Sequence, residues 1–285
     1  MQLSFGPLKI SVSGVTEKEV PANTLLFTDE SSGSADVSYT FRFVTTLPPP
    51  TDAIPIIKRT DIEIYRDGAL EMRRLGIKDT PGSTYAVIKE KAPNEVEIFF
   101  DESKKSSLVI DTIFISCLAL ERYMAQCKAI ILHCAFLAYN NKALLFSGPS
   151  GIGKSTHSNL WCKHIADTKV VNGDRCLIYR NKEGEYIASG WPVCGSSEIC
   201  HREEYPLHSI ILLHQCEENI ILNATPMQKF KQLCSQTTIN WWDKQHAEKM
   251  LDEIEMLTNK TPIVNYACNM TAEAPEILRK YLDGK

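Results

Sequence analysis

The residues best suited to chemistry lie in one glycine-rich stretch, positions 148–156. Gly148, Gly153, Lys154 and Ser155 fill every fixed position of the G-x-x-x-x-G-K-[ST] phosphate-binding loop. In such a loop, backbone amides converge on phosphate oxygens, and the next helix points its positive N-terminus at the same anion. The lysine adds charge for the outer phosphates, and the serine hydroxyl is a ligand for Mg²⁺. Nucleotide contacts are expected from Gly148, Pro149, Ser150, Gly151, Ile152, Gly153, Lys154, Ser155 and Thr156.

The stretches on either side of this loop predict the elements that hold it. Residues 143–146 form a short apolar run typical of a buried strand, and residues 156–163 can continue as a helix. Strand, glycine-rich turn and helix follow one another in the order that a phosphate-binding loop requires. The alternative is a glycine-rich turn without a ligand.

Asp174 is a candidate for a catalytic or metal-binding carboxylate. It follows the apolar pair Val170-Val171, twenty residues after the loop lysine. A carboxylate at a strand end facing the loop can hold Mg²⁺ or accept the proton of an attacking hydroxyl. The simpler alternative is that Asn172-Gly-Asp174 is only a turn, because these residue types dominate turns.

His133 is a second candidate. It stands within the apolar stretch 129–139, fifteen residues before Gly148. We expect this stretch to form a buried strand or a pair of strands. A histidine there serves either at the site or as a hydrogen-bonded core residue, and the stretch alone leaves both open.

The first hundred residues are organised differently from the rest. Short alternating or β-branched stretches, such as 8–12, 39–44 and 96–100, are separated by turn-forming residues. They predict a small, mostly antiparallel β domain with a hairpin turn at Asp67-Gly68. The polar segment 101–107 marks a boundary. We therefore divide the chain into an accessory β domain of unknown role, residues 1–105, and an α/β domain that carries the loop, residues 106–285.

In the second domain, the spacing of apolar residues differs from one stretch to the next. Some stretches have the spacing of a helix and others that of a strand, so we expect both kinds of element. Strands are expected at 129–139, 143–146, 170–171, 176–179, 209–213 and 263–267, and helices at 110–127, 156–163, 250–257 and 272–282. A hairpin turn is expected at 181–184.

The composition excludes several classes of protein. The fractions of hydrophobic and charged residues, 44% and 23%, are those of a globular protein, and apolar runs such as 210–213 are too short to cross a bilayer. The N-terminus shows no secretory leader, and the ten cysteines contain no C-x-x-C pair. A net charge of −4 without a long basic run argues against nucleic acid or a membrane surface as a partner. We expect a cytoplasmic protein with reduced thiols.

The order of these motifs resembles a known family over residues 110–282. His133 in a strand, the loop at 148–156, a helix, and Asp174 before a strand are similar to the bacterial HPr serine kinase/phosphorylase family, which shares its core with phosphoenolpyruvate carboxykinases. Gly190-Trp-Pro-Val-Cys-Gly195 and the stretch 206–213 resemble a kinase-like branch of that family. The resemblance implies an α/β fold with a P-loop, carboxykinase-like core. The N-terminal domain does not resemble the one that the sugar-regulation kinases carry.

The resemblance also implies roles for single residues. The loop would bind the β-phosphate of ATP, His133 and Asp174 would lie at the transfer site, and Ser155 and Asp174 would be ligands for Mg²⁺. The sugar-regulation kinases carry paired aspartates, whereas Gly173 precedes Asp174 here. Asp174 alone would then have to serve both the metal and the incoming hydroxyl.

A phosphoryl-transfer site also requires positive charge beside the γ-phosphate. Arg175 follows Asp174 directly, and neighbours in a strand point to opposite faces, so we expect Arg175 to lie away from the site. Arg202, in the polar stretch 196–204, is the better candidate, the alternative being a solvated surface charge.

Two functions fit these observations. The first is an ATP-dependent phosphotransferase that moves the γ-phosphoryl group to a hydroxyl, expected on a Ser or Thr of a small protein or peptide. The second is a non-catalytic ATP-binding regulator or assembly factor. Decarboxylation is not expected, because the sequence shows no Lys/His metal pair or substrate-binding arginine set. The family likeness is compatible with a homo-oligomer.

Overall fold

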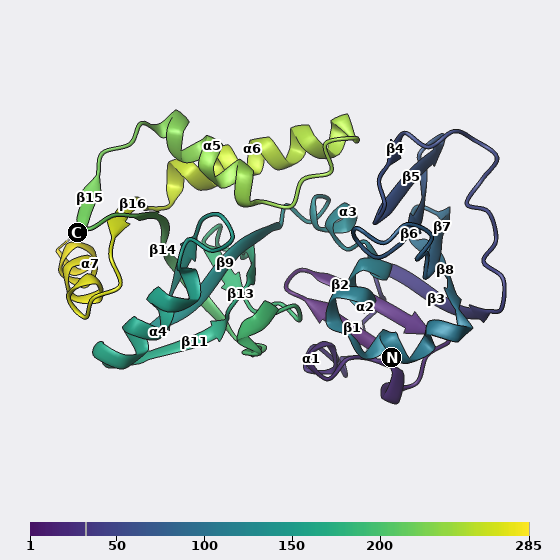
Figure 1. Cartoon of the computed structure of the whole chain (residues 1–285), viewed down its shortest axis with the longest axis horizontal. Coiled ribbons are helices and arrows are strands. Elements are labelled where there is room, and N and C mark those ends of the chain that lie inside the picture. The colour runs from purple at the N-terminus through teal and green to yellow at the C-terminus, as the bar shows by residue number, and fades with distance from the viewer. Residues whose placement is uncertain (32, 285) are drawn as a thin grey trace. The chain divides into compact units, whose positions relative to one another are not determined.

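The computed structural model describes residues 1–31 and 33–284. Ser32 and Lys285, the last residue of the predicted second domain, lie outside the described residues. The chain forms two compact units, Met1–Leu120 and Glu121–Lys285 (Figure 1). In the described part of the chain, each unit contains an eight-stranded sheet, so the protein has a mixed α/β fold.

The first unit is built around a sheet with the strand order β1-β2-β3-β8-β7-β6-β5-β4. Its strands are β1 Gln2–Phe5, β2 Leu8–Ser13, β3 Val37–Val44, β4 Ile57–Lys58, β5 Ile62–Asp67, β6 Leu70–Leu75, β7 Ala86–Ala92 and β8 Glu95–Asp101. The pairs β2–β3 and β3–β8 are parallel and the other pairs are antiparallel. The predicted hairpin turn is confirmed, since Asp67 pairs with Leu70 across Gly68.

Short helices accompany this sheet. They are η1 Glu17–Glu19, α1 Ala22–Leu25, η2 Glu102–Val109 and α2 Asp111–Leu118. Helix α2 packs on β3, where the Tyr39 hydroxyl donates a 2.7 Å hydrogen bond to the Leu118 carbonyl. The continuous helix predicted at 110–127 is wrong. Ala119 adopts a left-handed conformation (φ 47°), which ends α2 before the separate short helix α3, Glu121–Met124.

The second unit has a sheet that is covered on both faces. Its strands are β9 Ile130–Tyr139, β10 Lys142–Ser147, β11 Thr168–Asn172, β12 Arg175–Arg180, β13 Tyr186–Ser189, β14 Glu204–Gln215, β15 Ile220–Leu222 and β16 Ile263–Cys268. Its helices after α3 are α4 Lys154–His164, η3 Gly195–Ser197, α5 Pro226–Gln236, α6 Lys244–Lys260 and α7 Glu273–Asp283.

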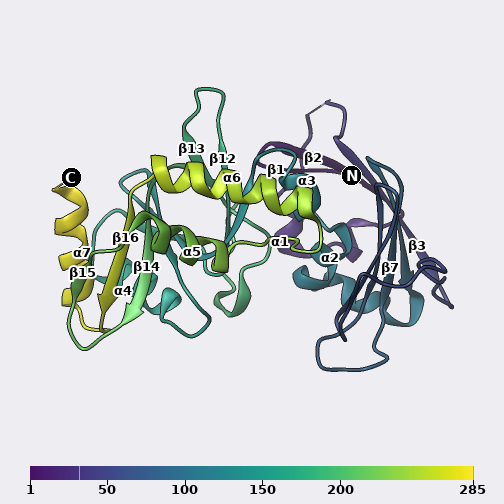
Figure 2. The same cartoon turned by 90° about the horizontal axis from the view of Figure 1, so that it is seen from above.

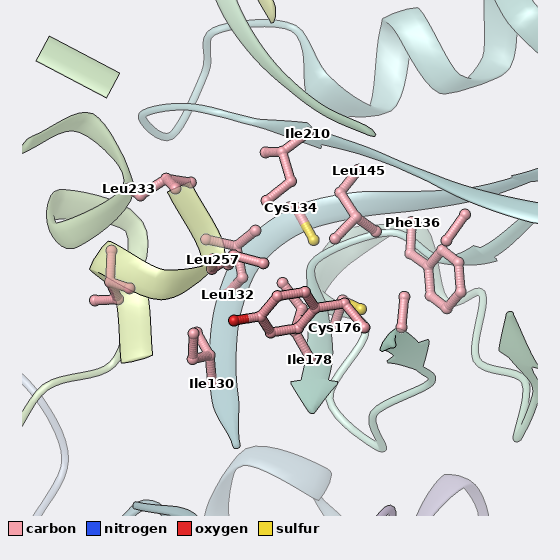
Figure 3. Close-up of a cluster of buried hydrophobic side chains, with 14 of the residues drawn as sticks. Ile130, Leu132, Cys134, Phe136, Leu145, Cys176, Ile178, Ile210, Leu233 and Leu257 are labelled. Atoms are coloured by element: carbon pink, nitrogen blue, oxygen red, sulfur yellow. The ribbon is translucent and has the colours of Figure 1, made fainter. Parts of the chain in front are cut away.

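Two apolar clusters lie on the two faces of this sheet. Leu132 and Cys134 of β9 pack with Leu233 of α5 and Leu257 of α6, as Figure 3 shows. On the other face, apolar residues of α4 and α7 pack with the intervening residues of β9. Helices α5 and α6 run side by side in both overall views (Figures 1 and 2). Burial on both faces explains why β9 and β16 are apolar almost throughout.

The strand directions determine which ends meet. Strand β14 pairs in parallel with both β10 and β16. The carboxyl ends of these three strands therefore lie at one edge of the sheet, the place where α/β sheets usually bind ligands. The glycine-rich loop at 148–153 leaves β10 at this edge and leads into α4.

Candidate functional site

The register of the sheet brings the predicted site residues together around β9. Ser147, the last residue of β10, lies opposite Cys134, and Arg175, the first residue of β12, lies opposite His133. The Cys134 amide donates to the carbonyl of Asp174 at 2.9 Å, and the Ser147 hydroxyl donates to the carbonyl of His133 at 2.8 Å. His133, Asp174 and the start of the glycine-rich loop are thus at the same level of the sheet.

Lys154 is held inside the glycine-rich loop. Its side chain is buried, and Nζ donates to the carbonyls of Gly148 and Pro149 at 3.1 and 3.2 Å. Burial lowers the pKa of Lys154, and the charge of Asp174 acts in the opposite direction. Ser155, the next residue, is exposed in the first turn of α4. Lys154 therefore donates its hydrogen bonds to two neutral carbonyls, and an anion could take their place.

The carboxyl ends of β14 and β16 contact the glycine-rich loop and α4. Gln215 Nε2 donates to the Gly151 carbonyl at 3.4 Å. On the other side, Cys268 Sγ lies 3.1 Å from Nε2 of His157, which is buried in α4. The loop is thus held by the strand ends around it.

Asp174 lies between a histidine and an arginine. Its Oδ1 is 3.5 Å from His133 Nε2, and its Oδ2 is 3.3 Å from Arg175 Nε. The hydrogen bond from His133 lowers the pKa of Asp174, helped by the charges of Arg175 and Lys154 and opposed by burial. The carboxylate therefore stays ionised at neutral pH beside the buried lysine.

The expectation that Arg175 lies away from the site is wrong. Asp174 stands in a bend before β12 begins, so the alternation of side chains along a strand does not separate the two residues. Arg202, which the sequence favoured, is exposed in the segment before β14. Arg175 is the arginine that contacts the Asp174 carboxylate.

Asn172 shapes the turn that presents Asp174, a role that sequence reasoning missed. Its side chain is fully buried, and its Oδ1 accepts from the amides of Asp174 and Arg175 at 2.8 and 2.9 Å. Its Nδ2 donates to the carbonyls of Trp191 and Val193. The Asn-Gly-Asp turn and the Gly190–Gly195 segment are therefore fixed by one amide. The residue types of the turn were visible in the sequence, but the contact of Asn172 with Trp191 and Val193 depends on the fold.

Two glycines allow the segment around η3 to close over Asp174. A Cβ on Gly173 would overlap the Ser197 side chain. Gly195 (φ 60°) faces the Asp174 side chain, where an added Cβ would lie 3.0–3.2 Å from Cβ, Cγ and Oδ1 of Asp174. A side chain at position 173 would therefore require Ser197 or the segment around η3 to shift.

The end of α5 also reaches the site. Gln236 Oε1 is 3.1 Å from Nδ1 of His133, and Thr238 Oγ1 accepts from Arg175 at 3.3 Å. Helix α5 was not predicted, although Thr225 and Gln228 form a capping box with Pro226 in the first turn. That signature was available in the sequence.

Together, the fold and the site define a mixed α/β protein in which a phosphate-loop sequence lies beside a His-Asp-Arg cluster. The chain belongs to the family described as SynChlorMet cassette protein ScmC, whose model matches residues 98–285. No protein of curated function matches the sequence. Among solved structures, the Hpr(Ser) kinase/phosphatase from Coxiella burnetii is similar at 15% identity and a TM-score of 0.34, covering 54% of this chain and 88% of that one.

None of the helices in the described part of the chain has the length and apolar character needed to span a bilayer.

Proposed function

We propose that this protein is an ATP-dependent phosphotransferase of the HPr kinase-like type, which moves a γ-phosphoryl group to a hydroxyl on a Ser or Thr of a small protein or peptide. The observation that carries the proposal is the convergence of Asp174, His133 and Arg175 beside Lys154 of a complete phosphate-loop sequence. Such a site combines a phosphate cradle, positive charge and a group that takes a proton, which is what phosphoryl transfer needs.

The loop and its lysine would bind the nucleotide. The amides of residues 148–153 and the N-terminus of α4 favour an anion, and Lys154 can exchange its two carbonyl partners for phosphate oxygens. Arg175 adds a second positive charge close to Asp174. These groups would stabilise charge that develops on the transferred phosphoryl group.

We infer that Ser155 and Asp174 would hold Mg²⁺. The hydroxyl of Ser155 and the carboxylate of Asp174 are hard oxygen ligands of the kind this cation prefers. When bound, the metal would neutralise charge on the phosphates. Because Asp174 also contacts His133, the histidine can take over the proton of the attacking hydroxyl and leave the carboxylate for the metal.

A non-catalytic ATP-binding regulator is the second candidate, and the packing of Ser197 against Gly173 favours it. That contact limits the site to one carboxylate at this turn. Incubation of the protein with γ-labelled ATP, Mg²⁺ and hydroxyl acceptors separates the two. Transfer of label to a Ser or Thr supports the phosphotransferase, whereas tight Mg²⁺-dependent binding without turnover on any acceptor supports the regulator.

A further inference from the structure

An exposed methionine lies beside the glycine-rich loop. Met270 follows β16 and is 54% exposed. A Cβ added to Gly153 would lie 3.5 Å from Cε of Met270, so the end of this side chain reaches the residue before Lys154. We propose that Met270 binds the base of the nucleotide whose phosphates occupy the loop. The proposal rests on the nucleotide site of the proposed function and goes beyond it, because it assigns the residue that contacts the base.

Asn269 holds the segment that presents Met270. Its Nδ2 donates to the Glu217 carbonyl at 2.7 Å, and its Oδ1 accepts from the Thr271 amide at 3.0 Å. The amide of Asn269 donates to Oδ1 of Asn219 at 3.0 Å, and Asn219 Nδ2 donates back to Oδ1 of Asn269 at the same distance. The backbone on both sides of Met270 is therefore fixed, while its own side chain stays exposed. A contact that is positioned before binding loses little entropy when the ligand arrives.

The order of the strands places this segment where the rest of a nucleotide would lie. Strand β14 pairs in parallel with β10 and with β16, so the carboxyl ends of all three lie at the same edge of the sheet. A nucleotide whose outer phosphates are held by residues 148–153 and Lys154 extends its nucleoside along this edge. The approach of Met270 to Gly153 shows that one ligand can contact both the glycine-rich loop and the segment after β16.

The chemistry around Met270 suits a base better than a phosphate. A thioether is polarisable and packs favourably on an aromatic ring. Glu217 and Glu218 follow β14, and Glu273 lies in the first turn of α7; all three are exposed. Their carboxylates repel a phosphate, whereas they exert no such force on a neutral base. A base stacked on Met270 would also cover apolar surface that is in contact with water in the free protein.

The fold does not depend on the Met270 side chain. On either side of it, Cys268 and Ala274 are buried and belong to the apolar cluster between the sheet and helices α4 and α7. Substitutions of an exposed residue usually change stability little. Variants at position 270 should therefore keep the native structure and report on binding alone.

The first test compares ATP with inorganic tripolyphosphate, which has the phosphates but no base, both in the presence of Mg²⁺. In calorimetric titrations, Met270→Ala should bind ATP about 3- to 10-fold more weakly than the native protein and should bind tripolyphosphate equally well. Met270→Leu keeps an apolar side chain and should retain most of the ATP affinity. As a matched control, Met227→Ala makes the same change at a methionine that is 60% exposed in the first turn of α5, and should leave both affinities unchanged.

NMR of methionine methyl groups observes the contact itself. The chain has seven methionines, and the signal of Met270 is the one that disappears in Met270→Leu. The ring current of a stacked base shifts the signal of a methyl group beneath it. ATP should therefore move the Met270 signal clearly more than tripolyphosphate does.

The inference would be overturned by a Met270→Ala protein that binds ATP as the native protein does, or that loses ATP and tripolyphosphate affinity equally. A Met270 methyl signal that responds identically to the two ligands would also overturn it. Phosphoryl transfer with an ATP affinity independent of Met270 would refute the base contact and leave the function standing. ATP binding that depends on Met270, without transfer to any acceptor, would refute the phosphotransferase and leave the base contact standing. A native protein that binds neither ligand would refute both.

Discussion

At the scale of single residues, Asp174 connects the groups of the site through its two carboxylate oxygens. One oxygen faces His133 and the other faces Arg175, while Lys154 contributes charge from the loop. The hydrogen bond and the two charges favour the ionised form. The same arrangement that would serve phosphoryl transfer therefore also stabilises the folded protein.

The pH dependence of stability tests this electrostatic arrangement. Because the pKa of Asp174 is lower in the folded protein than its unfolded value of about 3.9, its contribution is fully present above that pH. It is lost as pH falls through the folded pKa. Asp174→Asn should therefore show a shallower loss of unfolding free energy below about pH 4 than the native protein. Urea unfolding of both proteins at several pH values measures this, and parallel curves would contradict it.

Lys154 provides the second prediction for a single residue. Lys154→Ala removes the ammonium group that donates hydrogen bonds to two carbonyls of the loop. We expect loss of Mg²⁺-dependent ATP binding, because the outer phosphates lose their point charge. Calorimetric titration with ATP measures it, with Lys163→Ala at the far end of the same helix as control. Equal affinity of the native protein and Lys154→Ala would refute the assignment of the loop.

At the scale of elements, the segment around η3 determines how many carboxylates the turn can present. Gly173→Asp, which would restore a pair of aspartates, should destabilise the protein by about 1–3 kcal/mol because the new side chain overlaps Ser197. The double substitution Gly173→Asp with Ser197→Gly should recover much of this loss. Chemical denaturation of both, with Ser197→Gly alone as control, measures the effect. If Gly173→Asp were as stable as the native protein, the overlap with Ser197 would not restrict position 173, and the prediction would be wrong.

The sequence predicted the elements that have strong local signals. The apolar strand at 129–139, the strand and the helix on either side of the glycine-rich turn, and the β12–β13 hairpin at 181–184 are confirmed. The prediction of one continuous helix through Ala119 was wrong, and so was the prediction that Arg175 lies away from the site. Both outcomes depend on a local backbone conformation that the periodicity of side chains does not encode. Helix α5 was missed despite its capping box.

The contact between His133 and Asp174 could not be predicted from the local sequence around either residue. It depends on the register between β9 and β12, which pairs Arg175 with His133, and on the bend that separates β11 from β12. The sequence singled out both residues, but the resemblance to a family was what suggested that they share a site. The Asn-Gly-Asp turn was visible in the sequence, but the contacts of Asn172 with Trp191 and of Gln236 with His133 were not, because the fold supplies those partners.

At the scale of the whole molecule, every residue of the candidate site comes from the unit Glu121–Lys285. The family model, which begins at residue 98, covers this unit completely. The sequence placed the boundary near residue 105, and the structure divides the chain after Leu120.

Binding of nucleotide should stabilise the protein by mass action. A ligand present at a hundred times its Kd adds about 2.7 kcal/mol to the unfolding free energy if it binds only the folded state. We therefore expect MgATP to raise the Tm of the native protein and to leave Lys154→Ala unchanged. Thermal unfolding with and without MgATP measures this. An unchanged Tm of the native protein at saturating nucleotide would argue against a nucleotide site.

The most direct test of the central claim is transfer from γ-labelled ATP, measured in parallel for the native protein and Asp174→Asn with a panel of small proteins and peptides that contain Ser or Thr. We expect the native protein to label a hydroxyl in the presence of Mg²⁺. We expect Asp174→Asn still to bind ATP but to transfer the label at least about 100-fold more slowly. Full transfer by Asp174→Asn, or tight ATP binding by the native protein with no transfer to any acceptor, would refute the proposed function.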